Sequence, residues 1–225
     1  MVNADPVNAH CAMYDLHTLA QETPFLMVDH QNRDAVNGFE QNMYNGLLLH
    51  GLTSDSLEMA ESMAHYSRGV YTFRRSAMPE HELRLWMLCG IAGGIRPWLH
   101  IVGAVQEDMR MLQMDREIMD WHWNNQDNLE GGQPIASIGL VWSQRNVIFY
   151  GQDQPDVRCG QPWRGFVHAL VRARIPFLPL CAADIPRDTA HFHTLILLPY
   201  TLQRTLYTSH HRTGYHTLLT YHLLL

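Results

Sequence analysis

PEHELRLWMLCGIAGGIRPWLHIVGA, residues 79–104, contains a helix, its end and the strand that follows. Pro79 suits the first turn of a helix. The acidic residues beside it, Glu80 and Glu82, would interact favourably with the positive N-terminal end of the helix dipole. The adjacent residues Gly93 and Gly94 end the helix. The apolar stripe that such a helix would bury is formed by Leu83, Met87 and Ile91.

The same alternation of strand and helix extends to both sides of this stretch. Apolar runs predict strands at 24–29, 56–67 and 96–104, and helical spacing predicts helices at 36–50 and 105–128. Because the strands are almost continuously apolar, we expect them to be covered on both faces, as in a parallel α/β sheet. Polar side chains gather where the strands end, and in a parallel barrel that edge carries the chemistry.

A second α/β unit follows the segment NLEGGQP at 128–134, which predicts a boundary between domains. It is predicted to be open and doubly wound, and no GxGxxG motif follows its first strand, which excludes a dinucleotide site there. Its expected elements are a strand at 135–143, a helix at 162–174 and strands at 175–180 and 193–199. The predicted domains are therefore 1–128 and 129–200, with an atypical tail at 201–225 whose role the sequence does not indicate.

The composition excludes several classes of protein. The net charge is −6 and all 16 basic residues are arginine, so a nucleic-acid surface, a Walker-A lysine and a pyridoxal lysine are excluded. No apolar run could cross a membrane and no signal peptide is visible. The four cysteines lie far apart, which favours free thiols in a reducing cytoplasm. His191-x-His193 lacks a third nearby ligand, so no metal and no cofactor are predicted.

The amino-acid sequences of several segments resemble those of a known family. RLWMLCGIAGGIRPWLHIVGA, PIASIGLVWSQRN, GFVHALVRARIPFLPL and LILLP, within residues 24–200, resemble bacterial glycoside hydrolases of family 42, the β-galactosidases. The resemblance implies a partial (β/α)8 barrel, with its eighth strand at 96–102, followed by an incomplete flavodoxin-like trimerisation domain. It further implies retaining hydrolysis of a carbohydrate substrate, and a homo-oligomer.

The resemblance also implies roles for particular residues. Glu61, or failing that Glu58, matches the glutamate nucleophile at the end of the seventh strand; the alternative is a solvated carboxylate. Trp98 would stack on a sugar ring and His100 would bond a hydroxyl; the alternative is that both belong to the core. The expected substrate-binding residues are Asp29, His30, Asn32, His65, Trp98 and His100.

The sequence departs from the family at the general acid. In the family this carboxyl group comes from the fourth barrel strand, whereas this sequence is expected to start near the fifth or sixth strand. Asp29 lies at the end of a different strand and therefore does not take the position of the general acid. We therefore expect a fragment that is inactive alone, or alternatively a non-catalytic α/β module that mediates oligomerisation.

Overall fold

The computed structural model describes residues 2–3, 15–24, 26–30, 39–53, 60–63, 79–99, 108–132, 135–198 and 217–220. Its contacts divide the chain into two compact units. The first contains residues 1–5 and 19–132, and the second contains residues 6–18 and 133–225. The division at Gly132 lies inside the segment that the sequence indicates as a boundary. The N-terminal residues 6–18, however, group with the second unit and not with the predicted first domain.

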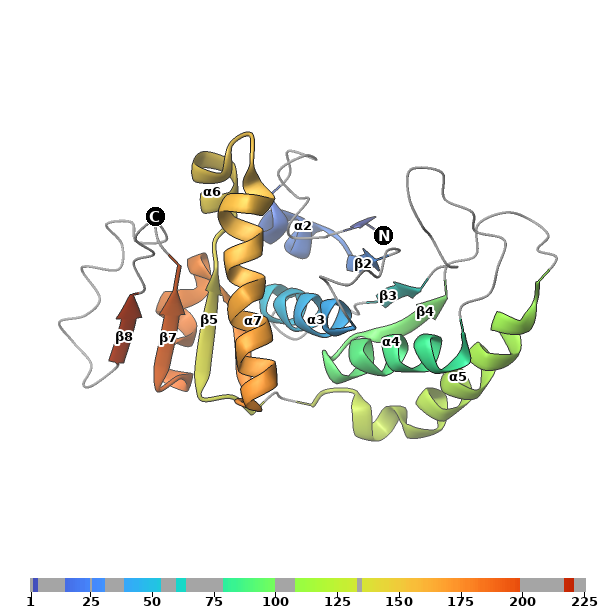
Figure 1. The fold of residues 1–225 in the computed structure, drawn as a ribbon. Helices are drawn as coiled ribbons and strands as arrows, with labels where there is room; N and C mark the ends of the chain where they lie inside the picture. Colours follow the sequence, from blue (N-terminus) through green and yellow to red (C-terminus); the bar gives the residue numbers. More distant parts are fainter. Residues whose placement is uncertain are drawn as a thin grey trace. The chain divides into compact units, whose positions relative to one another are not determined.

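The first unit contains a parallel sheet whose strands follow one another in the order of the chain, β1-β2-β3-β4 (Figure 1). The strands are β1 (Val2–Asn3), β2 (Leu26–His30), β3 (Ala60–Met63) and β4 (Arg96–Leu99). Its helices are α3 (Glu40–Thr53), α4 (Glu80–Ala92) and α5 (Arg110–Leu129). Helix α2 (Leu16–Glu22) spans the division, because residues 16–18 group with the second unit and residues 19–22 with the first. The three predicted strands and the helix from residue 79 are confirmed, whereas β1 and α2 were not predicted. The prediction of the helix start at residue 36 was wrong where it can be checked, because α3 begins at Glu40.

Helix α4 supplies much of the core of this unit. Its buried residues Leu83, Trp86 and Met87 form a cluster with Ile118 of α5. The ring of Phe39 meets that of Trp86 edge-on, with centroids 6.4 Å apart, and the Asn42 amide of α3 donates a hydrogen bond to the Trp86 carbonyl oxygen over 3.3 Å. These contacts hold α3, α4 and α5 together on the sheet.

The turn between α4 and β4 has the glycines that the sequence indicated. The Gly93 N–H bonds the carbonyl oxygens of Cys89 and Gly90 and caps the helix. Gly94 has a φ of 80°, a left-handed conformation that a side chain disfavours. Ile95 then enters the core with 2% of its surface exposed, and β4 begins one residue later.

The exposure of the side chains differs around helix α5. Within the chain, Ile118 is buried, but Trp121 is 45% and Trp123 70% exposed. Ile118 marks the buried side of the helix, and the two indoles lie on different sides of it because residues 121 and 123 are about 200° apart around a helix.

The second unit contains a second parallel sheet with the strand order β6-β5-β7-β8. Its strands are β5 (Ile138–Trp142), β6 (Phe177–Cys181), β7 (Thr194–Leu197) and β8 (Thr217–Thr220). Helix α7 (Gln161–Ala173) lies along this sheet (Figure 1). The predicted strands and helix are confirmed, and β8 shows that the tail adds a strand to the sheet, which the sequence did not indicate.

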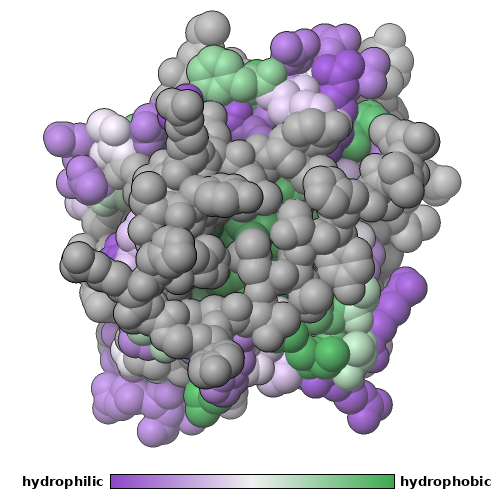
Figure 2. Space-filling view, turned by 90° about the vertical axis from the view of Figure 1, so that its left-hand side faces the viewer, coloured by the Kyte–Doolittle hydropathy of each residue, from purple (hydrophilic) through white to green (hydrophobic). Residues whose placement is uncertain are grey.

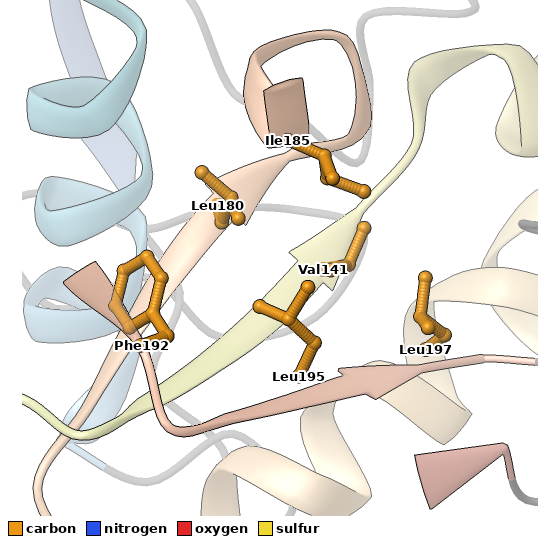
Figure 3. Packing of buried hydrophobic residues seen from close by; sticks show 6 residues of the cluster. All are labelled: Val141, Leu180, Ile185, Phe192, Leu195 and Leu197. Carbon is orange, nitrogen blue, oxygen red and sulfur yellow. The ribbon is translucent and has the colours of Figure 1, made fainter. Parts of the chain in front are cut away.

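Both faces of the second sheet are packed. On one face, Val141, Leu180 and Leu197 form a register row across β5, β6 and β7, and Phe192 and Ile185 lie against them (Figure 3). On the α7 side, the Trp142 and Trp163 rings meet edge-on with centroids 5.4 Å apart. Val167 and Leu170 of α7 are also buried. Burial on both faces explains why these strands are continuously apolar.

Candidate functional site

The carboxyl ends of β2, β3 and β4 bring several of the predicted site residues into register. Asp29 pairs with Ser62, and Ser62 pairs with Trp98. Glu61 pairs with Val28 and with Pro97, one row earlier. His30 pairs with Met63, in the row that follows Asp29. Because neighbouring rows of a parallel sheet alternate between its faces, Asp29 and Glu61 occupy rows of opposite faces.

The structure describes the predicted site residues to different extents. Trp98 is half-buried in β4. Asp29 and His30 end β2 and Glu61 lies in β3, where the backbone is described but the side chains are not. The remaining predicted residues lie outside the described residues; these are Glu58, Asn32, His65 and His100. The nucleophile and substrate-binding roles therefore stay predictions.

A second group of polar residues follows β6, at the carboxyl edge of the second sheet. Arg187 forms hydrogen bonds with both carboxylate oxygens of Asp188, each over 2.6 Å, and an ion pair of 3.4 Å with buried Asp184. Burial of the Cys181 thiol raises its pKa far above the ordinary value, and the negative charge of Asp184 adds a smaller increase. Cys181 is therefore a protonated core thiol and a poor nucleophile. The sequence did not single out the ion pairs, because an Arg-Asp dipeptide is common at surfaces.

The connection between β5 and α7 contains an unusual helical segment. It consists of α6 (Gln144–Asn146) and two π-helical turns, η1 (Val147–Gly151) and η2 (Asp156–Gly160). Ser143 caps α6, since its hydroxyl oxygen accepts a hydrogen bond from the Asn146 N–H. Arg158 donates to the Tyr150 and Gly151 carbonyl oxygens and so joins the two π-helical turns.

This connection exposes apolar side chains. Phe149 is 66% exposed and has the Arg145 guanidinium 5.6 Å from its ring centre. The other exposed apolar residues of the segment are Ile148 and Val157. In the view of Figure 2, the coloured hydrophobic atoms lie in several separate patches, some of them beside hydrophilic atoms. Such patches are compatible with a weak contact surface and do not by themselves define one.

Within the described ranges, no three histidine, cysteine or acidic side chains are placed to hold a metal ion. His191 ends a 3-10 turn and His193 precedes β7, so the two histidines do not lie together on one strand. No helix in the described part of the chain has the length and apolar character that crossing a bilayer requires.

The fold is similar to that of a glycoside hydrolase. The chain matches the structure of a β-galactosidase from Bacillus circulans sp. alkalophilus with a TM-score of 0.66 and 16% sequence identity. The match covers 92% of this chain and 33% of that protein, so the chain spans about a third of its length. No protein-family model matches the sequence, and no curated protein is significantly similar to it. The chain thus has a β-galactosidase-like α/β fold, as the resemblance predicted at this coarse level.

Proposed function

We propose that this chain is part of a glycoside hydrolase of the β-galactosidase type. The observation that carries the proposal is the shared fold, which covers 92% of the chain and therefore includes both units. The first unit would contribute strands to a (β/α)8 barrel, and the second would be a flavodoxin-like domain. The substrate would be a carbohydrate and the reaction hydrolysis of a glycosidic bond with retention.

The strand orders support the two domain assignments. The strands of the first sheet are parallel and follow the order of the chain from β1 to β4. Helix α3 stands between β2 and β3, α4 stands between β3 and β4, and α5 follows β4, as in an arc of a (β/α)8 barrel. In the second sheet, the first strand in sequence lies between the second and the third, and the fourth follows the third. This is the order 2-1-3-4 with which a flavodoxin-like sheet begins.

The chemistry requires more carboxyl groups than these strands bring together. A retaining mechanism needs two carboxyl groups about 5 Å apart, one as nucleophile and one as acid. The candidates are Asp29, next to last in β2, and Glu61, the second residue of β3, and they belong to alternate rows. Because adjacent rows lie on opposite faces of the sheet, at most one of the two would be a member of the pair. We propose that the second member comes from barrel strands other than β1 to β4.

The proposal is tested in an active polypeptide that contains these residues together with a complete barrel. Glu61→Gln and Asp29→Asn are compared for release of nitrophenol from a nitrophenyl β-galactoside. Loss of the nucleophile should lower turnover by about 10³-fold or more. One of the two variants should show this loss with an unchanged circular dichroism spectrum. Full activity in both variants would exclude both carboxylates and contradict the site.

A second candidate function is a non-catalytic module that mediates self-association. It is favoured by the exposed aromatic side chains, Phe149 on η1 and Trp123 on α5. Light scattering on the purified chain tests the assembly role when Phe149→Ser is compared with the unchanged chain. An oligomer that dissociates in the variant would support an assembly role. A chain that is monomeric with or without the substitution would count against it.

A further inference from the structure

We propose that the Gln144 side chain anchors the start of helix α2 in the second unit, and that this anchor opens locally while the rest of the chain stays folded. The anchoring bond joins the Leu16 N–H to the Gln144 Oε1 atom over 3.1 Å, between positions 128 residues apart in the sequence. Both residues belong to the second unit. The anchor is a conformational device and does not depend on the proposed function.

The Leu16 N–H requires an acceptor from outside its own helix. Leu16 is the first residue of α2, and the first four N–H groups of a helix have no intrahelical carbonyl partner. The Asp15 carboxylate accepts a hydrogen bond from the Thr18 N–H over 3.2 Å, so it serves the helix as a local cap. Leu16 itself is 1% exposed, and a buried N–H without an acceptor is costly. The helix can therefore begin at Leu16 because Gln144 supplies the acceptor.

The anchor lies at the carboxyl edge of the second sheet. Gln144 follows the end of β5 by two residues and opens α6. The ends of β5 and β6 are in register, with Trp142 paired to Cys181. Burial raises the pKa of the Cys181 thiol most, and the carboxylates of Asp184 and Asp15 add smaller increases, so Asp15 lies near the end of β6. Open α/β sheets bind ligands outside this edge, and here a segment of the chain itself lies there.

Helix α2 has little else to stabilise it. It has seven residues, whereas an isolated helix of fewer than about 12–15 residues is marginal in water. Among its described side chains, Leu16 and Ala20 are buried, and Thr18, Gln21 and Glu22 are exposed. Segments with few buried apolar contacts open at a free energy well below that of global unfolding. We therefore expect α2 to open before the sheets do.

Opening of α2 would change how the chain passes from one unit to the other. The helix crosses the division between the units, which falls between residues 18 and 19. With the bond to Gln144 in place, this crossing is a helical segment that is fixed at its start. Without the bond, the helix can unwind from Leu16, and the crossing becomes a flexible link.

Hydrogen exchange in the full chain, resolved to single amides by NMR, tests the anchor. In the unchanged chain, the Leu16 amide should exchange at least about tenfold more slowly than the Glu80 amide, after correction for intrinsic rates. Glu80 is the matched position, because it is the exposed first residue of α4 and its N-cap Pro79 makes no side-chain cap. Gln144→Leu removes the acceptor and should speed exchange at Leu16 by about tenfold or more, with β5 and β6 unchanged.

Two further variants separate the hydrogen bond from other effects of substitution. Gln144→Glu keeps an oxygen acceptor, so the Leu16 amide should stay protected. Arg145→Leu makes the same replacement one residue later, at an exposed side chain that lies over the Phe149 ring. It should leave exchange at Leu16 unchanged.

Several outcomes would overturn the anchor. Leu16 could exchange as fast as Glu80 in the unchanged chain, or just as slowly in Gln144→Leu as in the unchanged chain. Equal acceleration in Arg145→Leu would show that the conformation of α6, and not the bond, protects α2. A Gln144→Leu chain that fails to fold, or whose β5 and β6 amides exchange as fast as those of α2, would contradict local opening.

Discussion

Gly93 is the residue at which the end of α4 comes closest to α3. A Cβ atom at this position would lie 2.5 Å from the Met43 carbonyl oxygen and 2.9 Å from its Cα atom. Both are backbone atoms, which cannot move aside as a flexible side chain can. The absence of a side chain at Gly93 therefore determines how closely the two helices pack.

Gly93→Ala should lower the free energy of unfolding by about 2–3 kcal/mol, because the added methyl group must displace helix α3. The matched control is Gly165→Ala in α7, where a Cβ atom would meet nothing within 4 Å. That substitution should stabilise the protein by about 0.5–1 kcal/mol, since alanine loses less entropy than glycine in a helix. Urea unfolding of both variants measures the difference. Equal effects at the two sites would show that α3 and the turn are not in contact.

Asp115 on α5 should make stability depend on pH. Burial raises the pKa of its carboxyl group from 3.8 to about 6. The folded state therefore binds the proton more tightly than the unfolded state, and the stability that Asp115 contributes at low pH is lost as the pH rises through about 6. Asp115→Asn should raise the melting temperature above pH 6 and leave it nearly unchanged below pH 4. Melting curves of both proteins across this range measure the effect, and the same difference at every pH would contradict it.

The register of the candidate site residues could be predicted only in part. Asp29 and Trp98 were singled out because polar and aromatic residues follow apolar strands. The sequence could not show that Ser62 joins them, or that Glu61 falls in the other row, because the register between strands depends on contacts distant in sequence. A shift of one residue moves every side chain of a strand to the opposite face.

Among the secondary-structure elements, those with strong local signals were predictable. Helix α4 has acidic residues at its start, an apolar stripe and two glycines at its end, and it lies where expected. Strands β5, β6 and β7 were visible as apolar runs because they are buried on both faces. The short elements α2 and β8 have few residues and weak periodicity, so their formation depends on tertiary contacts.

The two faces of α5 should respond differently to truncation. Ile118 is 6% exposed and packs in the core with α4, whereas Trp123 is 70% exposed. Ile118→Ala should lower the free energy of unfolding by about 2–4 kcal/mol because it leaves a cavity. Trp123→Ala should change it by less than about 0.5 kcal/mol in the monomer. Chemical unfolding of both variants tests this, and a larger loss for Trp123→Ala would place the aromatic face in a core.

At the scale of the whole molecule, the chain crosses between its two units more than once. Residues 6–18 group with the second unit although the sequence assigned them to the first. Within the second unit, the Leu16 N–H bonds the Gln144 Oε1 atom over 3.1 Å. No local pattern in the first residues indicates this grouping, since it arises from a contact with a segment more than a hundred residues away.

This crossing predicts the outcome of limited proteolysis. The chain should be cut between Glu130 and Ile135, because Gly131 and Gly132 follow the end of α5 and Ile135 is 94% exposed. The two fragments should nevertheless elute together in size-exclusion chromatography, because residues 6–18 remain part of the second unit. Fragments that separate without denaturant would contradict the grouping. A chain that resists cleavage at 130–135 would show that the linker is protected.

The central proposal is that these strands belong to a carbohydrate-binding barrel and bring together at most one member of its catalytic carboxyl pair. Proton NMR of the purified chain with methyl β-galactoside tests both parts in one measurement. The account predicts saturation transfer from protein to the sugar protons, and no anomeric signal of free galactose over time. Binding without turnover is expected because general acid help, typically about 10²- to 10⁴-fold, is missing together with the rest of the pocket. Absence of saturation transfer, or release of free galactose by the monomeric chain, would contradict the account.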